Sequence, residues 1–201
     1  RLRGMLEVVA LWAAQDSEST LLWLESNAQG LARLETLNSG VELWAQRDPQ
    51  AAAGWIDGMA NDGSKITAAK SLASTWVKNN PVEASAWVTQ LPYGAIRDEA
   101  ASALALSWME TDPVAAADWA YEESRQTTNP QLYIDAIRGF AGIDPEQAES
   151  FIRNRPTADP INPNYINEFI EARAESDPLA TAEWIQQLPS SDPLYRTNNT
   201  E

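Results

Sequence analysis

The segments DPQAAAGW at residues 48–55 and DPVAAADW at residues 112–119 decide the fold. Each begins with Asp–Pro, which is typical of a helix start. The aspartate caps free backbone amides, and proline fits the first helical position because its missing N–H is not needed there. Alanine three residues after the proline and tryptophan six residues after it lie on one face of a helix. The two segments therefore predict amphipathic helices.

The same pattern recurs outward from these segments, with a period of 32 residues. One aromatic column is Trp12, Trp44, Trp76, Trp108 and Phe140, and a second is Trp23, Trp55, Trp87, Trp119, Phe151 and Trp184. The capping column is Asp16, Asp48, Asn80, Asp112, Asp144 and Asp177. A small column is Thr20, Ala52, Ala84, Ala116, Ala148 and Thr181, and an aliphatic column is Leu24, Ile56, Val88, Ala120, Ile152 and Ile185. Columns in phase over six copies predict a stacked repeat array.

Each period has room for two helices and their turns. We expect the first helix of one copy to run from Pro49 to about Ala60, and second helices to span Ile66–Lys78, Asp98–Glu110 and Gln131–Ile143. Turn chemistry separates them at residues 61–64, 91–94 and 127–130. The tryptophans are expected to pack between helices rather than to hold a ligand. One phase slip is expected in the proline-rich stretch 156–163, and Arg173 stands where the first aromatic column requires an aromatic residue.

The two quoted segments, each followed by a helical hairpin, resemble the tetratricopeptide repeat class. Copies with Leu91-Pro92 and Leu188-Pro189 also resemble a divergent repeat found in uncharacterised bacterial proteins. The period of 32 is shorter than the usual 34, and the glycine and tyrosine expected after the tryptophan are missing. The resemblance implies an all-α fold, a right-handed α–α superhelix of about six hairpins. We expect one array over residues 1–201, with units near 1–15 (partial), 16–47, 48–79, 80–111, 112–143, 144–176 and 177–201 (partial).

Composition argues against several classes of function. Cysteine and histidine are absent, which removes thiolate ligands, cysteine nucleophiles and the commonest general base. The net charge is −15, which disfavours nucleic acid and would favour a basic partner, although acidity is more often a matter of solubility. No apolar run approaches the length of a membrane helix. We expect no cofactor, no metal site and no membrane insertion of this segment.

An enzyme remains a minor alternative, since some inverting glycosidases close helical hairpins into a toroid. The acid pairs that could serve are Asp98 with Glu99, Glu122 with Glu123, and Glu146 with Glu149. None lies in an irregular, aromatic-lined insertion, so these acids are expected on solvated helix faces. No phosphate-binding glycine loop or nucleophile elbow is present. We therefore predict no catalytic residues.

A binding groove is expected on the first helices, as the tetratricopeptide resemblance implies. The positions five and eight residues after each proline point away from the packing face and vary between copies. The candidate groove residues are Glu25, Asp57, Thr89, Asp118, Tyr121, Arg153, Glu183 and Gln186. Tyr121 and Arg153 are the most typical of interfaces, because aromatic and guanidinium groups often anchor them. A merely solvated face is an equally good interpretation of these rows.

The function predicted from these features is a non-enzymatic scaffold that binds a protein or peptide through a concave groove. The alternative is an architectural spacer of a larger, multidomain protein. The chain starts at Arg1, inside a second helix, and shows no capping helix at either end. We therefore expect it to be part of a longer protein whose targeting signals lie elsewhere.

Overall fold

A computed structural model describes residues 8–9, 11–12, 15–27, 30–127, 129–155, 164–190, 192 and 194. All regular secondary structure among these residues is helical, which confirms the all-α prediction. The chain forms two compact units, Arg1–Trp108 and Met109–Glu201. Each unit is a row of antiparallel hairpins, and each is described separately below.

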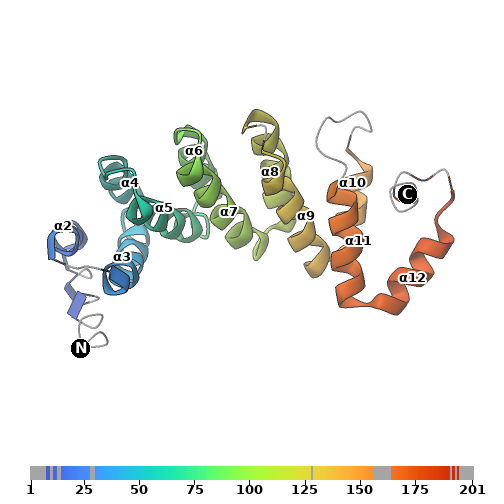
Figure 1. The fold of residues 1–201 in the computed structure, drawn as a ribbon, viewed down its shortest axis with the longest axis horizontal. Coiled ribbons are helices and arrows are strands. Elements are labelled where there is room, and N and C mark those ends of the chain that lie inside the picture. Colours follow the sequence, from blue (N-terminus) through green and yellow to red (C-terminus); the bar gives the residue numbers. More distant parts are fainter. Residues whose placement is uncertain are drawn as a thin grey trace. The chain divides into compact units, whose positions relative to one another are not determined.

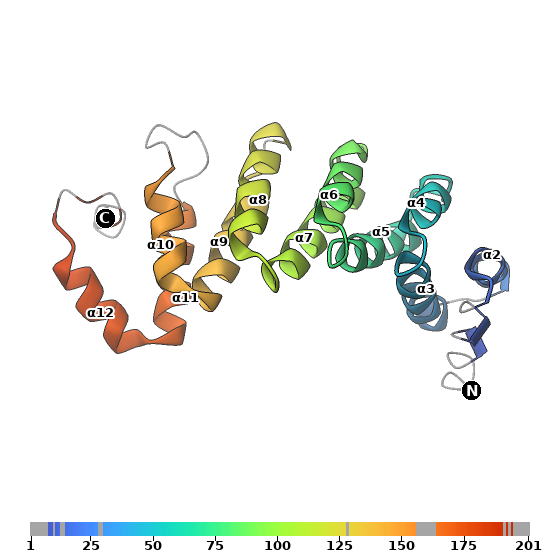
Figure 2. The ribbon, with the colours of Figure 1, turned by 180° about the vertical axis from the view of Figure 1, so that it is seen from behind.

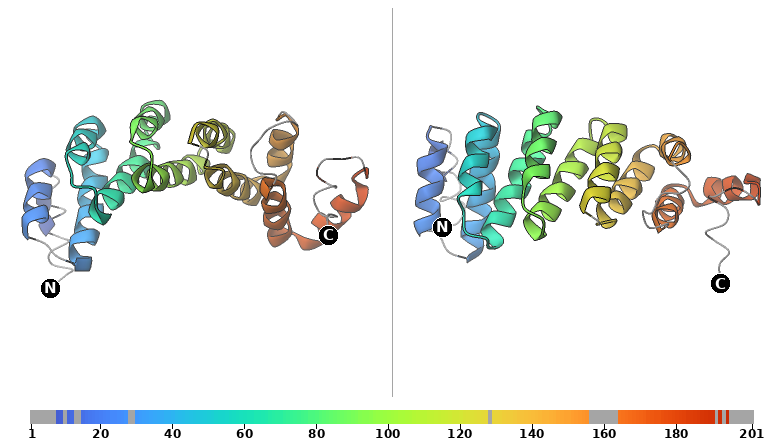
Figure 3. Two further views of the ribbon diagram at one scale, coloured as in Figure 1. Left: turned by 45° about the horizontal axis from the view of Figure 1, so that its top comes forward. Right: turned by 90° about the horizontal axis from the view of Figure 1, so that it is seen from above.

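The first unit contains three helix pairs among its described helices. Its helices are α2 (Ser17–Asn27), α3 (Gly30–Ala45), α4 (Pro49–Asp57), α5 (Gly63–Trp76), α6 (Pro81–Gln90) and α7 (Ala95–Met109), whose last residue opens the second unit. Along the row, α4 lies between α2 and α6, and α5 lies between α3 and α7 (Figures 1 and 2). The first helices α2, α4 and α6 occupy one side and the second helices the other (Figure 3). Gly40 lets α3 approach α2, because a Cβ there would stand 2.7 Å from Leu21 Cδ2.

The second unit repeats this arrangement. It contains α8 (Pro113–Thr127), α9 (Gln131–Ile143), α10 (Pro145–Arg153), α11 (Asn164–Ser176) and α12 (Pro178–Gln187). Helix α9 packs against α8, α10 and α11, and α12 packs against α11. Helices α8 and α10 again lie on one side, with α9 and α11 on the other (Figure 3).

The predicted helix caps are present in all six copies. In each, the side chain of the capping residue accepts a hydrogen bond from the backbone N–H three residues later, over 2.9–3.2 Å. Asn80 does this as the aspartates do, so the column serves its capping role without a charge. In the first and last copies, Thr20 and Thr181 also donate a side-chain hydrogen bond to the carbonyl of the capping residue. The capping column therefore fixes where each first helix begins.

The core follows the predicted columns. The small column is fully buried in every copy, as are Ile56, Val88 and Ala120 of the aliphatic column. In five copies the aromatic residue of the second column, on a first helix, packs against an aromatic residue that precedes this helix in the second helix of the preceding copy. The pairs have ring centroids 5.8–6.2 Å apart: Trp12–Trp23, Trp44–Trp55, Trp76–Trp87, Phe140–Phe151 and Phe169–Trp184. The tryptophans thus pack between helices, as expected.

Burial within the two aromatic columns varies from copy to copy. In the first column Trp44, Trp76 and Phe140 are buried, whereas Trp12 and Trp108 are half-buried. In the second column Trp87 is buried, Trp55, Trp119, Phe151 and Trp184 are half-buried, and Trp23 is 41% exposed. The aromatic residues therefore pack between helices without being buried to the same extent.

The missing aromatic at Arg173 is replaced by Phe169, one helical turn earlier on α11. Phe169 is fully buried and meets Trp184 edge-on at 5.8 Å. The Arg173 guanidinium lies 4.9 Å from the centroid of the same tryptophan ring. An aromatic residue four positions away reaches the same face of a helix, so the aromatic pair is conserved although the column is broken. The predicted phase slip at residues 156–163 lies outside the described residues.

Several helix boundaries differ from the prediction. Helix α9 spans Gln131–Ile143 as expected, whereas α4 ends at Asp57 and α5 begins at Gly63. The early start of α5 has a clear cause: Asp62 Oδ1 accepts hydrogen bonds from the backbone N–H groups of Ser64 and Lys65. The segment expected to be only a turn thus carries a second helix cap.

Candidate binding groove at the hairpin turns

A groove of about 720 Å³ opens in the first unit where the turns of two successive hairpins meet. We call it the turn groove. It is formed by the α4–α5 turn, the start of α5, the end of α6 and the α6–α7 turn. Its lining includes Asp57, Lys65, Ile66, Trp87, Leu91 and Tyr93. The volume falls within the range of typical ligand pockets.

One wall of the turn groove is the segment Leu91–Gly94. Leu91 is buried and its N–H donates to the carbonyl of Val88, which ends α6. Gly94 has φ +129°, a conformation that L side chains rarely adopt, so glycine is required for this turn. The turn leaves Tyr93 72% exposed at the rim. The Leu-Pro motif seen in the sequence therefore builds a groove wall with an exposed aromatic ring.

The floor of the turn groove includes Trp87. Its side chain is only 9% exposed and packs against Trp76, with ring centroids 6.2 Å apart. The indole Nε1 is buried and has no hydrogen-bond partner among the described residues. A buried donor without an acceptor is unusual in a folded protein. A residue of the groove lining therefore carries an N–H donor that lacks an acceptor in the described part of the chain.

Two buried cations support the walls. Lys65 Nζ donates to the carbonyls of Asp57 and Met59, at 3.0 and 3.4 Å, and Arg97 donates to the carbonyl of Leu91 at 3.2 Å. Both therefore satisfy carbonyls at the end of the first helix of their own hairpin. The guanidinium of Arg97 also lies 4.6 Å from the centroid of the Tyr93 ring.

Lys65 and Arg97 are one 32-residue period apart, so the repeat pattern also contains a basic column. Arg33 precedes them by 32 residues, although its side chain lies outside the described residues. A basic residue that recurs with the 32-residue period therefore indicates a buried cation that hydrogen-bonds to carbonyls at the end of a first helix. Because these cations are turned inward, the charges exposed around the groove are those of Asp57 and Asp62.

Of the predicted groove residues, Asp57 lines the turn groove. In the same unit, Thr89 is half-buried, and the side chain of Glu25 lies outside the described residues. In the second unit Asp118, Arg153, Glu183 and Gln186 are exposed, as the surface rows predict. Whether these residues bind a partner stays a prediction.

Tyr121 is the exception: it is 4% exposed, so its placement on an exposed row was wrong. Its ring packs against Tyr133 at 5.2 Å, and the guanidiniums of Arg125 and Arg155 lie 5.6 and 4.5 Å from its centroid. Helix α8 is longer than α4, α6 or α10, so its second half contacts α9 and is covered there. Tyr121 is thus part of the packing of the second unit.

Tyr133 lies at the centre of this aromatic cluster, between Tyr121 and Tyr165. Burial raises the pKa of its phenol well above the ordinary value, and Tyr165 raises it further. Its hydroxyl has no hydrogen-bond partner among the described residues. The phenol therefore stays neutral and acts as a packing group.

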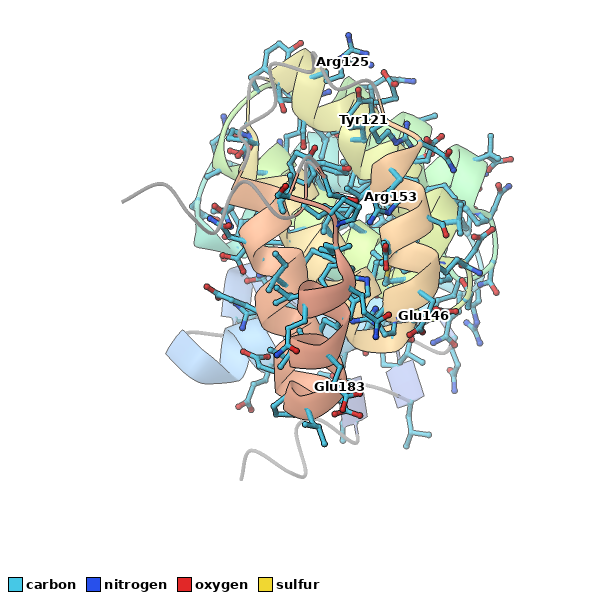
Figure 4. All side chains as sticks on the ribbon, turned by 90° about the vertical axis from the view of Figure 1, so that its right-hand side faces the viewer. Tyr121, Arg125, Glu146, Arg153 and Glu183 are labelled. Atoms are coloured by element: carbon cyan, nitrogen blue, oxygen red, sulfur yellow. The ribbon has the colours of Figure 1, made fainter. Side chains whose placement is uncertain are left out.

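Arg153, the other interface candidate, is held by Glu149 at 2.8 Å and Asp192 at 2.9 Å. Burial lowers the pKa of this guanidinium, but the hydrogen bonds to the two carboxylates outweigh burial and raise it. Figure 4 shows Glu183 well apart from Tyr121 and Arg153. The predicted residues of the second unit therefore do not converge on one point.

Several acids considered for catalysis are engaged in ion pairs. Glu99 pairs with Lys70, Glu122 with Arg125 and Glu146 with Arg173. Among the described side chains, no group of three acids is gathered as a metal would require. None of the described helices has the length and apolarity needed to cross a membrane.

We found no protein-family model, curated protein or solved structure that matches this chain. Any statement about its function therefore rests on the described side chains and their arrangement.

Proposed function

We propose that this chain is a non-enzymatic scaffold that binds a peptide segment of another protein in the turn groove. We further infer that its hairpins wind into a right-handed superhelix of the tetratricopeptide type, as the repeat pattern implies. The observation that carries the proposal is the groove itself: about 720 Å³, with an aromatic floor, an exposed aromatic rim and unpaired polar groups. Apolar walls with a few polar groups are typical of binding sites.

The form of the groove favours a peptide over a small enclosed ligand. Asn61, Asp62, Pro92, Tyr93 and Gly94 line it and are all exposed. An occupant would therefore keep one side in contact with solvent, as a bound peptide segment does. Tyrosine at the rim supplies a large contact area at a low cost in side-chain entropy.

Selection from a display library of random peptides about ten residues long tests this proposal. Tyr93→Ala is the groove variant, because Tyr93 is 72% exposed and its loss should leave the fold intact. Val82→Ala is the matched control, since Val82 is 75% exposed on α6 and does not line the groove. We expect enriched peptides to bind the parent and Val82→Ala alike, and Tyr93→Ala about tenfold more weakly.

Two outcomes contradict the proposal. If the library yields no enriched peptide, or if the enriched peptides bind Tyr93→Ala as well as the parent, the turn groove is not a binding site. The architectural spacer would then be the better interpretation of the repeat array.

A further inference from the structure

The turn groove combines three features that together specify a class of ligand: exposed negative charge, aromatic and aliphatic walls, and an unpaired N–H donor. We propose that the segment it binds is an extended peptide carrying a lysine or arginine two residues away from an aliphatic residue. This inference rests on the proposed function and adds the chemistry of the partner to it.

The charge at the groove comes from Asp57 and Asp62. Asp57 is exposed, and no ion pair or hydrogen bond joins its carboxylate to a described residue. Asp62 uses one carboxylate oxygen, Oδ1, to cap α5, which leaves its second oxygen without a described partner. A lysine or arginine side chain can donate to these carboxylate oxygens. Such charge-assisted hydrogen bonds are stronger than hydrogen bonds between neutral groups.

The two cations near the groove, Lys65 and Arg97, do not neutralise the exposed carboxylates of Asp57 and Asp62. Lys65 is 9% exposed, and its Nζ is occupied by the carbonyls of Asp57 and Met59. Arg97 is buried, donates to the carbonyl of Leu91 and lies over the Tyr93 ring. An acidic peptide would therefore meet two exposed carboxylates and no exposed cation of the lining. The charge complementarity selects a basic partner.

The remaining lining suits the rest of such a peptide. Ile66 and Leu91 offer aliphatic contacts, and Trp87 and Tyr93 offer aromatic ones. In an extended peptide, residues two apart point to the same side, so a basic and an aliphatic side chain can enter together. A peptide carbonyl at the floor would give the Trp87 Nε1 group the acceptor that it lacks within the described residues.

The test uses the peptides enriched from the random library, measured by fluorescence anisotropy against the parent and two charge variants. Asp57→Asn removes one of the two exposed groove charges while keeping the shape of the side chain. Glu35→Gln is the matched control, because Glu35 is exposed on α3 of the same unit and does not line the groove. We expect Asp57→Asn to raise the Kd about three- to tenfold, and Glu35→Gln to leave it within about twofold.

A second measurement addresses the peptide. In each enriched sequence the basic residue is replaced by glutamine and by glutamate. We expect affinity to fall with glutamine and to fall further with glutamate, because like charges then meet at the groove. Trp87→Phe keeps an aromatic ring against Trp76 but removes the N–H donor, and we expect it to raise the Kd by about threefold.

The outcomes separate this inference from the proposed function. If groove-dependent peptides are enriched but lack a basic residue, the ligand class is wrong and the scaffold function stands. If Asp57→Asn and Glu35→Gln weaken binding equally, the attraction is a general effect of the net charge and the assignment to Asp57 is wrong. If no peptide depends on Tyr93, both the function and the ligand class fail.

Discussion

The two compact units share one repeat pattern but use their cations differently. In Arg1–Trp108, the buried Lys65 and Arg97 donate to backbone carbonyls at the end of a first helix. In Met109–Glu201, arginines bridge separate segments through carboxylates: Arg138 to Glu168 and Glu175, Arg155 after α10 to Asp118 on α8, and Arg173 to Glu146. The first unit also contains a bridge of this kind, Lys70–Glu99, but Lys65 and Arg97 donate to the backbone.

The difference follows from the charge content of the two units. The second has 17 acidic and 6 basic side chains, whereas the first has 12 and 8. An arginine in the second unit therefore finds a carboxylate within reach more readily. The comparison shows that the apolar columns determine how the helices pack in both units, whereas the polar links between helices differ from one unit to the other. In the first unit Lys65 and Arg97 donate to backbone carbonyls, so they do not pair with the exposed carboxylates of Asp57 and Asp62 in the turn groove.

The largest expected effect concerns what the units share. Trp76 in the first unit and Phe140 in the second are both buried members of one aromatic column. We expect Trp76→Ala and Phe140→Ala each to destabilise their own unit by about 3–5 kcal/mol, because each leaves a cavity in a packed core. Hydrogen–deuterium exchange measures the loss in each unit separately.

Trp23→Ala is the control for this comparison, since Trp23 is 41% exposed. Less apolar surface returns to water there, and we expect less than half of the loss. Equal losses for Trp23→Ala and Trp76→Ala would show that burial does not set the cost of removing a tryptophan from the aromatic columns.

The next effect concerns what the units do not share. Lys65→Met leaves the carbonyls of Asp57 and Met59 without their donor, and we expect a cost of about 1–3 kcal/mol in the first unit. Arg155→Met removes the pair with Asp118 and the contacts with the rings of Tyr121 and Phe151, at 4.5 and 4.1 Å. We expect Arg155→Met to lower the free energy of unfolding of the second unit by only about 1 kcal/mol, because Asp118 is largely exposed and the ion pair is screened by solvent.

Ionic strength sharpens this contrast. The cost of Arg155→Met should shrink as salt is added, because an exposed ion pair is screened, whereas the cost of Lys65→Met should change little. Urea unfolding of the parent and of both variants, at low and at high salt, measures the stability cost of each substitution under the two conditions. The same salt dependence for the two variants would mean that the two kinds of link do not differ physically.

The smallest effect concerns the caps, which both units use. Hydrogen bonds from the side chain and the backbone N–H of Ser19 lower the pKa of Asp16 below its ordinary value of 3.8. Because the folded-state pKa is the lower one, this cap stabilises α2 fully above pH 3.8 and loses its effect as the pH falls through the folded value. We expect the amides at the start of α2 to exchange faster in that acidic window, after correction for intrinsic rates.

The Asp16→Asn variant keeps the acceptor but removes the titration, so its α2 should show no such step. The natural Asn80 cap of α6 provides the same comparison within the parent chain. Equal loosening of α2 in parent and variant would assign the acid effect to another group.

Much of each hairpin could be predicted from the sequence. The caps at Asp16 to Asp177 and the buried small column have local causes, because an N-cap bond spans three residues and a helix face repeats every 3.6. The α5 cap at Asp62 was missed because Asn61-Asp62-Gly63-Ser64 is also typical of a turn. Phe169 could not be predicted from the 32-residue period, because it lies one helical turn before the expected position on α11 and still reaches the same face of the helix.

The candidate site was less predictable. Asp57 was included among the groove residues, but the Leu91–Gly94 wall and the Trp87 floor come from the next hairpin. Tyr121 was misplaced because its helix, α8, extends over α9 where the other first helices have already ended. These features depend on which neighbouring segment covers a side chain, and helical periodicity carries no such information.

The sequence by itself determined the period, the helical class and the helix starts, since each follows from bonds and faces within one hairpin. Tertiary structure decided which tryptophans are half-exposed, which cations are turned inward and where a groove opens between turns. Those properties depend on how one hairpin covers the next. The physical reason is that burial and charge exposure are set by contacts between segments distant in the chain.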